Sequence, residues 1–328
     1  MKLRILTIIV TKVSLAVLGL SFLLTSCLRE GLEDCVLKDN VFLSVKTDFD
    51  LRVSTAAAAD WYAINSVSVY VIDQNNKFVT SWHGGAYIAG IDYLVPLRLD
   101  KGTYRFVVWT NEGVSYTVSP SNPELKGILL MDEMTINMVI PADRKIRELI
   151  PHRHYGIVSE AQVIQNRDNY YTITIKPHTY KVNFTVKGLT TTNDLYDFTV
   201  SDNNSSHTFD NSVISGRDRY QHIRSTGFEV KSDDTVNNAT QGVLNASMIL
   251  LQIDDGTETT FALSNNTTGE TLYTADLIQS IQQAYRSSGE TLDFSRTFEF
   301  DMVITFLTNL KVSVSVNGWS YIEQEQEL

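Results

Sequence analysis

Strict alternation of apolar and polar residues is the feature that most limits what this chain can fold into. The clearest run lies at residues 298–306, where the apolar members are Phe298, Phe300, Met302, Ile304 and Phe306. Successive side chains of a β-strand point to opposite faces, so a period of two predicts a strand with one buried face. The same alternation occurs at residues 41–46, 66–71 and 181–187. Together these runs predict an all-β fold.

The C-terminal end of the chain carries a further alternating run. Residues 310–316 alternate after a short Thr308-Asn309 turn. This predicts an antiparallel hairpin with residues 298–306, whose second strand continues to about Ile322.

Two other segments have distinct patterns. Residues 103–109 are apolar on both faces from Phe106 onward, which predicts a central strand, and the preceding Asp100-Lys101-Gly102 predicts a hairpin turn with a positive φ at glycine. A short helix is predicted from Asp276 to Tyr285, with Asp276 as its N-cap or as an acid in its first turn. Its apolar side consists of Leu277, Ile278, Ile281, Ala284 and Tyr285.

The chain is long enough for two domains. Pro177 separates two predicted strands and suggests a boundary, giving β-sandwich domains at 41–177 and 178–328, the second with the single helix. Stretches rich in Ser, Thr and Asn predict long surface loops in the second domain, at residues 201–212, 231–247 and 263–269. Alternating strands with turn residues between them favour sandwiches over barrels.

The N-terminal segment has the pattern of an export signal. Lys2, Arg4 and Lys12 accompany a long apolar run that ends in Leu24-Thr25-Ser26-Cys27, which resembles a bacterial lipobox. This predicts a signal peptide at 1–26, cleavage between Ser26 and Cys27, lipidation of Cys27 and a tether at 27–40. The alternative is an uncleaved membrane helix, since residues 5–24 are nearly long enough to span a bilayer.

Charge and cysteine content exclude several classes of function. The formal net charge is −11, and loss of the three basic residues of the signal makes it more negative, so phosphate would repel the chain and a nucleic-acid partner is not expected. The only cysteines are Cys27 and Cys35, so lipidation of Cys27 leaves Cys35 without an intrachain partner. Neither a disulfide framework nor a cysteine metal site is expected.

No residue constellation indicates an enzyme, a metal site or a cofactor. His152-x-His154 has no third ligand at a fixed spacing, so a solvated loop pair is favoured. Asp254-Asp255-Gly256 lacks the EF-hand spacing and is typical of a hairpin turn. Of the tryptophans Trp61, Trp82, Trp109 and Trp319, we expect Trp109 in the core. Trp82 and Trp319 lie near glycines and could form part of an exposed sugar-stacking platform.

Several segments in order resemble the FimB/Mfa-type fimbrial anchor lipoproteins of Bacteroidetes. They are the lipobox with Cys35 eight residues on, Leu99 to Asn111, His154-Tyr-Gly156, Tyr180 to Val186, and Val312 to Trp319. The resemblance spans nearly the whole chain after the signal. The large polar loops between about 190 and 270 depart from the family pattern.

The resemblance implies two tandem transthyretin-like β-sandwich domains in a subunit at the base of a fimbrium. It implies attachment of shaft subunits (fimbrillin) to the outer membrane through a lipid, with Glu30, Glu33 and Asp34 resembling an acidic surface-export signal. It also implies strand exchange, for which the C-terminal strand is the candidate, with Leu310, Val312, Val314, Val316 and Trp319. Two alternatives remain open: that this strand closes its own domain, and that the chain is a surface glycan-binding lipoprotein of a nutrient-uptake system.

Overall fold

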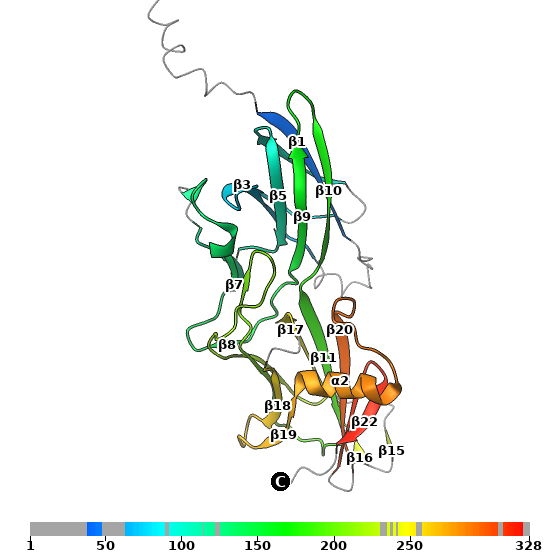
Figure 1. Cartoon of the computed structure of the whole chain (residues 1–328). Helices are drawn as coiled ribbons and strands as arrows, with labels where there is room; N and C mark the ends of the chain where they lie inside the picture. The colour runs from blue at the N-terminus through cyan, green and yellow to red at the C-terminus, as the bar shows by residue number, and fades with distance from the viewer. Residues whose placement is uncertain are drawn as a thin grey trace, which may run out of the picture.

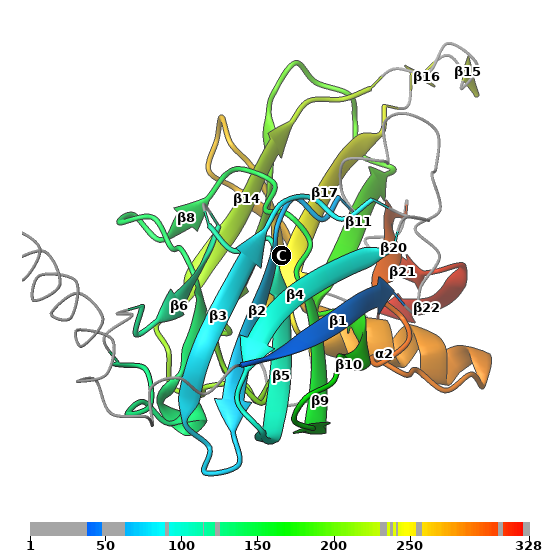
Figure 2. The same ribbon diagram turned by 90° about the horizontal axis from the view of Figure 1, so that it is seen from above.

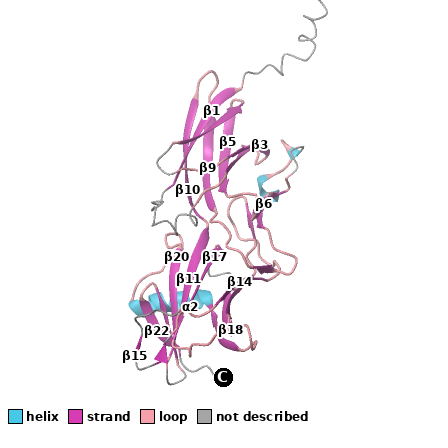
Figure 3. Cartoon of the chain, turned by 180° about the vertical axis from the view of Figure 1, so that it is seen from behind, coloured by secondary structure: helices cyan, strands magenta, loops and turns pink. Residues whose placement is uncertain are grey.

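Figure 1 shows an elongated molecule with a group of strands at each end. The computed structural model describes residues 38–47, 63–88, 92–113, 115–121, 125–229, 235–236, 239–240, 242–253, 258–307 and 311–323. Strands dominate this portion of the chain, with one α-helix and short 3-10 turns (Figure 3). The predicted all-β class with a single short helix is confirmed.

The N-terminal end is built on a seven-stranded sheet. Its order is β3-β2-β5-β9-β10-β1-β4, in which β1 pairs parallel with β10 and antiparallel with β4. The strands are β1 (Asp39–Thr47), β2 (Val67–Asp73), β3 (Phe78–Gly84), β4 (Tyr93–Leu99), β5 (Gly102–Thr110), β9 (His154–Val163) and β10 (Asn169–Pro177). Figure 2 shows β1 and β4 crossing over β5 and β9, so that the sheet closes over an apolar core.

The alternation of apolar and polar residues explains which strands have one face exposed to solvent. Val41, Leu43 and Val45 of β1 are fully buried, whereas Phe42 and Ser44 between them are partly exposed. β5 differs, because Phe106 and Val108 enter this core while Val107 and Trp109 enter a second one on the opposite face. The prediction that residues 103–109 form a central strand is confirmed.

The predicted hairpin turn at Asp100-Lys101-Gly102 is wrong. β4 pairs with β1, whereas β5 pairs with β2 and β9, and Gly102 does not have a positive φ. The physical reason lies in the two patterns: β4 has one polar face and lies in an outer layer, but β5 is apolar on both faces and needs cover on each. The connection therefore passes from one layer to the other.

A second core lies in the middle of the molecule and draws on both halves of the chain. It is lined by β6 (Tyr116–Ser119), η2 (Met131–Glu133), β7 (Thr135–Met138) and β8 (Lys145–Ile146) from the first half. From the second half it is lined by Phe209, which follows β13 (Ser206–Thr208), by β14 (Tyr220–Thr226), and by Ile249 and Leu251. β7 pairs with β13 and β8 pairs with β14. β10 ends at Pro177 and β11 begins at Thr179, but strand pairing crosses this point, and the domain boundary remains a prediction.

The C-terminal end consists of two facing sheets. One has the order β17-β11-β20-β21-β22, and the other β19-β18-β12-β14-β8. Their remaining strands are β11 (Thr179–Lys187), β12 (Tyr196–Asp202), β17 (Leu244–Leu251), β18 (Thr260–Asn265), β19 (Thr271–Asp276), β20 (Glu299–Phe306), β21 (Val312–Val316) and β22 (Trp319–Glu323). Between the sheets, Phe184 stacks on Phe261 with ring centroids 4.5 Å apart.

The loop predictions for this half are only partly correct. The expected loop at 201–212 contains β13, and the one at 231–247 contains the start of β17 and a small hairpin of β15 (Thr235–Val236) and β16 (Ala239–Thr240). These strands are short or begin in polar sequence, so composition alone does not reveal them.

The predicted helix is present as α2 (Leu277–Ser288). The Asp276 carboxylate accepts a hydrogen bond from the Gln279 backbone N–H at 2.9 Å, which confirms the N-cap. Gly289, with φ 78°, ends the helix three residues beyond the predicted limit. The helix packs its apolar side into the core between the two sheets. Figure 3 shows the helix lying across the strands of this end.

Replacing Phe184 tests the core between the C-terminal sheets. Phe184→Ala removes a ring that is 1% exposed, so we expect the free energy of unfolding to fall by about 3–5 kcal/mol, as measured by urea denaturation. Tyr170→Ala is the matched control, because that ring is 69% exposed and its loss should change little. Equal losses for the two variants would contradict the placement of this core.

Candidate functional site

Most residues predicted to attach the chain to a membrane lie outside the described residues. This applies to Ser26, Cys27, Glu30, Glu33 and Asp34. Trp61, Leu310 and the Asp254-Asp255-Gly256 turn also lie outside them. Among the helices that the structure describes, none combines the length and apolar character required to cross a bilayer.

The candidate strand-exchange residues fall on two strands, not one. Val312, Val314 and Val316 lie on β21 with their side chains in the core, and β21 is paired on both sides, with β20 and with β22. The predicted hairpin of residues 298–306 with the following run is therefore confirmed. Here β21 pairs within its own sheet, as expected from the alternative in which this run closes its own domain. Trp319 lies on β22, at the edge of the sheet, and is 40% exposed.

A tight turn divides the run that was predicted to be one strand. Asn317 and Gly318 both have left-handed backbone, with φ 49° and 87°, and β21 pairs with β22 across them. Asn-Gly between alternating residues is a strong signal for a two-residue hairpin turn. The prediction of one continuous strand to Ile322 is wrong because this signal in the sequence was missed.

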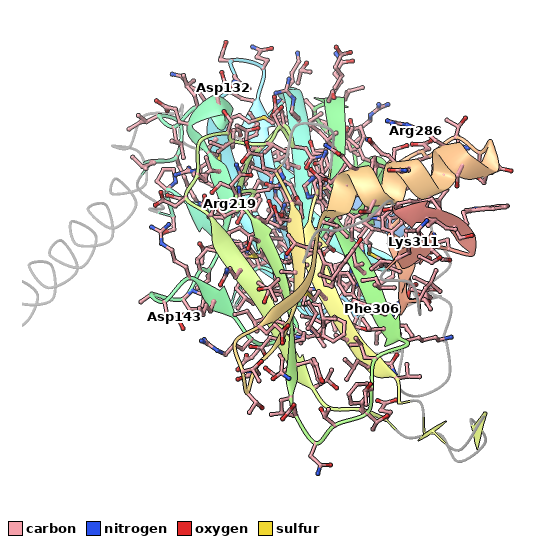
Figure 4. The ribbon with its side chains drawn as sticks, turned by 90° about the horizontal axis from the view of Figure 1, so that it is seen from below. Asp132, Asp143, Arg219, Arg286, Phe306 and Lys311 are labelled. Atoms are coloured by element: carbon pink, nitrogen blue, oxygen red, sulfur yellow. The ribbon has the colours of Figure 1, made fainter. Side chains whose placement is uncertain are left out.

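The free edge of β22 is partly covered. The two residues that flank a two-residue hairpin turn form a hydrogen-bonded pair, and hydrogen-bonded and non-hydrogen-bonded pairs alternate along the ladder from there. The backbone N–H and C=O groups of Ser320 and Ile322 therefore point away from β21. The Ser287 hydroxyl of α2 donates to the Ser320 carbonyl at 3.1 Å. Ile322, which is 60% exposed, lies beyond this contact. Figure 4 views this end of the molecule, with Arg286 on α2 and Lys311 beside β21 labelled.

The tryptophans do not form a common platform among the described residues. Trp109 is fully buried, as predicted. Trp82 lies on β3 and packs edge-on against Tyr93 at 6.1 Å, whereas Trp319 lies on β22. Figure 1 shows these two strands at opposite ends of the molecule. One ligand could not stack on both rings.

The expectation of a solvated pair at His152 and His154 is wrong. Both imidazoles are fully buried, as is Arg153 between them. His152 Nδ1 lies 2.8 Å from the Thr179 hydroxyl, and His154 Nδ1 lies 2.9 Å from the Thr110 hydroxyl. The segment leads into β9, which begins at His154, and polar partners inside the protein replace the water that the sequence pattern suggested.

Arg153 is the centre of a buried polar cluster. Its Nη2 donates to His178 Nδ1 at 2.8 Å and to His207 Nδ1 at 2.9 Å. The guanidinium also lies over the rings of Trp109 and Tyr116, at 4.8 and 5.1 Å from their centroids. Among the described residues, no carboxylate lies within salt-bridge distance of it. Two imidazole lone pairs and two π faces therefore replace a counter-ion.

The contacts of Arg153 decide the protonation of both histidines. A guanidinium only donates, so each Nδ1 must accept, and both rings are neutral with the proton on Nε2. Burial holds the pKa of His178 and of His207 well below the usual range, and the Arg153 charge acts in the same direction. Burial also lowers the pKa of Arg153, to about 10, which leaves it charged at neutral pH.

Sequence reasoning found only some of this cluster. It singled out His152 and His154 by their spacing but gave no role to Arg153, His178 or His207. His178 is the single residue between β10 and β11, and His207 lies in the short strand β13. No periodic pattern links these positions, because they come together only through the packing of three distant segments. Within the described portion of the chain, no group of three or more potential ligands could hold a metal ion.

Comparison with known proteins identifies the family. Residues 32–325 match the family of fimbrillin-A associated anchor proteins Mfa1 and Mfa2. Because this match covers most of its length, the chain belongs to this family of fimbrial anchor proteins. No curated protein sequence matches the chain. A fimbrium-associated role at the cell surface follows from that membership, and the family is not one of enzymes.

Solved structures share the fold. A candidate polysaccharide-binding protein from Bacteroides thetaiotaomicron is 18% identical with a TM-score of 0.66, over 89% of this chain and 100% of that one. The fimbrial anchor protein Mfa2 from Porphyromonas gingivalis is 16% identical with a TM-score of 0.60, over 86% and 98%. A candidate adhesin from Bacteroides ovatus is 15% identical with a TM-score of 0.62, over 88% and 97%. At these identities the similarity concerns the fold alone.

The buried histidines predict sensitivity to acid. Burial lowers the pKa of His152 to about 4 and that of His154 and His222 to about 3, so between these values and about 6.5 only the unfolded chain binds the protons. We expect the histidine contribution to the free energy of unfolding to be constant above pH 7.5 and to fall below pH 6.5. The slope is up to about 1.4 kcal/mol per pH unit for each histidine. Urea denaturation at pH 7.5, 6 and 5 measures it.

His83 supplies the control for this titration. It is the one histidine of six with an exposed side chain, so His83→Gln leaves the five buried imidazoles in place and the fall in stability at low pH should persist. A stability that does not change between pH 7.5 and pH 5 would contradict the burial of the other five.

Changing Arg153 tests the cluster itself. A lysine has no planar guanidinium to lie over the Trp109 and Tyr116 rings while it donates to both imidazoles, so Arg153→Lys should lower the free energy of unfolding by about 2–5 kcal/mol. Arg147→Lys is the control, because Arg147 is exposed and pairs with Asp143 in water. If both variants unfold at the wild-type urea midpoint, the cluster does not hold the middle of the molecule together.

Proposed function

We propose that the chain is the lipid-anchored base subunit that attaches a fimbrial shaft to the outer membrane. Membership of the fimbrial anchor family, over residues 32–325, is the observation that carries this proposal. The matched region begins just after Cys27, the residue of the lipobox that would be acylated. A folded body joined by a short tether to an acylated cysteine is suited to a passive mooring.

A lipid anchor is physically sufficient for this role. Each buried CH₂ contributes about 0.8 kcal/mol, so one acyl chain binds weakly, whereas two or more hold a protein at the membrane. Glu30, Glu33 and Asp34 lie in the short tether that comes next and match the acidic export signal proposed for surface lipoproteins. In this proposal the body is held outside the outer membrane at the base of the fimbrium.

We further propose that a shaft subunit binds by adding a strand at β22. Exchange of β21 would remove Val312, Val314 and Val316 from the core, at a cost of about 1.5–3 kcal/mol for each side chain. β22 needs no such loss, because its outer backbone groups at Ile322 already face away from the sheet. Backbone hydrogen bonds at that edge would supply affinity, and alternate side chains would supply specificity.

Replacing the lipobox cysteine tests the anchoring. We expect Cys27→Ser to abolish metabolic palmitate labelling and to release the folded chain from the outer-membrane fraction. Cys35→Ser is the matched control and should change neither property. Labelling or membrane retention that survives in Cys27→Ser would overturn the lipid anchor.

A proline at the edge strand tests the strand addition. Ile322→Pro removes an outward N–H without breaking the hydrogen bonds between β21 and β22, so co-purification of shaft subunit with the outer-membrane chain should fall at least tenfold. Ile322→Val keeps the N–H and should bind as the wild type does. Equal recovery of shaft subunit with the two variants would show that this edge is not used.

A further inference from the structure

A pocket of about 360 Å³ opens beside the point where β8 and β14 begin. Its walls are the loop that precedes β8, the loop that precedes β14 and the start of β13. This volume is within the range of small-ligand sites. The polar and charged residues of the lining are Arg144, Ser205, Ser206, Arg217, Asp218 and Arg219. Figure 4 labels Arg219, one of these residues.

The lining is positively charged in a chain that is acidic overall. It contributes three arginines and only one carboxylate, that of Asp218, whereas the whole chain has a formal net charge of −11. Asp143, from the loop that precedes β8, pairs with Arg147 at 2.7 Å and lies outside the lining. Glu258 pairs with Arg219 at 3.0 Å, also from outside the lining, and the local charge stays positive when it is counted. A concave surface of this charge attracts anions.

Contacts within the protein fix Arg144 in the wall of this pocket. Its backbone is left-handed, with φ 58°, which is uncommon for a residue that has a side chain. Its N–H donates to the Pro141 carbonyl at 2.8 Å, and its own carbonyl accepts from the Gln221 N–H at 2.9 Å. Its Nη2 pairs with Asp218 at 2.6 Å, which joins the loop before β8 to the loop before β14. The two loops are thus connected without a ligand, and backbone of this kind is concentrated at functional sites.

Other donors in the lining have no partner within the described part of the chain. The Arg217 guanidinium forms neither an ion pair nor a hydrogen bond with any described residue. The residue is exposed, so its N–H donors can reach a ligand in the pocket. On the wall formed by the start of β13, neither the Ser205 nor the Ser206 hydroxyl donates to another described residue. Hydrogen-bond donors are therefore available from two walls of the pocket.

We propose that this pocket binds a phosphate group, either free or as a phosphate monoester. A guanidinium pairs with phosphate oxygens through two parallel hydrogen bonds, and hydroxyl groups supply further donors. The oxygens of a tetrahedral phosphate point in several directions and can meet donors on more than one wall, whereas a planar carboxylate offers only two oxygens. The arrangement of Arg217 opposite two serines therefore favours phosphate. This inference does not depend on the proposed anchoring role.

Calorimetric titration of the whole chain at neutral pH tests the proposal. The probes are inorganic phosphate, glycerol 3-phosphate and malonate, each at up to about 10 mM, which detects binding in the millimolar range. A constant ionic strength of about 0.1 M keeps the screening of charges equal for all three. We expect at least one phosphate probe to bind tenfold more tightly than malonate, a carboxylate of comparable charge. Binding of both phosphate probes indicates that free phosphate is sufficient, and binding of glycerol 3-phosphate alone identifies an esterified source.

Arg217→Gln is the decisive variant, because it removes the guanidinium without breaking a contact to any described residue. We expect phosphate binding to weaken at least tenfold while the urea midpoint stays at the wild-type value. Arg98→Gln is the matched control, because Arg98 of β4 is also exposed, has no ion pair with a described residue and lies outside this lining. It should bind phosphate as the wild type does.

Three results would overturn the inference. The first is the absence of binding heat with both phosphate probes. The second is malonate binding as tight as that of phosphate, which would make the site a general anion site. The third is an equal effect of Arg217→Gln and Arg98→Gln, which would show attraction to surface charge and no defined pocket. Circular dichroism spectra equal to that of the wild type establish that each variant is folded.

Discussion

A guanidinium that is shut away from water must find its partners inside the protein, and Arg153 finds them on four separate segments. They are His178 between β10 and β11, His207 on β13, Trp109 on β5 and Tyr116 on β6. A buried charge is stable only while such contacts stay complete, since loss of one leaves a desolvated group without compensation. The middle of the molecule is therefore held in one arrangement.

Much of the fold could be predicted from the sequence because its strands obey a period of two. The alternation at 298–306 and 181–187 gave strands with the expected buried faces, and the spacing at Asp276 to Tyr285 gave the helix with its cap. Which strands pair with one another was harder to predict, because the pairing depends on the layer that each strand joins. The turn at Asp100-Lys101-Gly102 has hairpin residues but joins strands of different layers, while Asn317-Gly318 makes a real hairpin.

The buried cluster could not be predicted because tertiary packing creates it. Polar residues such as those at 152–154 are most often exposed to solvent. Here they are buried because the segment that leads into β9 packs next to the second core. The free edge of β22, in contrast, could be predicted from the sequence. The Asn-Gly turn separates β21 from β22 and indicates that Ile322, and not the three buried valines, lies at the exposed edge. Family membership came from the order of several motifs together, and no single motif was decisive.

The way β1 is built into its sheet has a mechanical consequence. β1 is the first described strand, and it lies between β10 and β4 with seven residue pairs on each side. Figure 1 places it at the end of the molecule opposite β22. Tension between the start of β1 and the far sheet acts along the strand, so the hydrogen bonds on both flanks share the load in shear and do not break in succession. Under tension, the first strand is thus held along both of its edges at once.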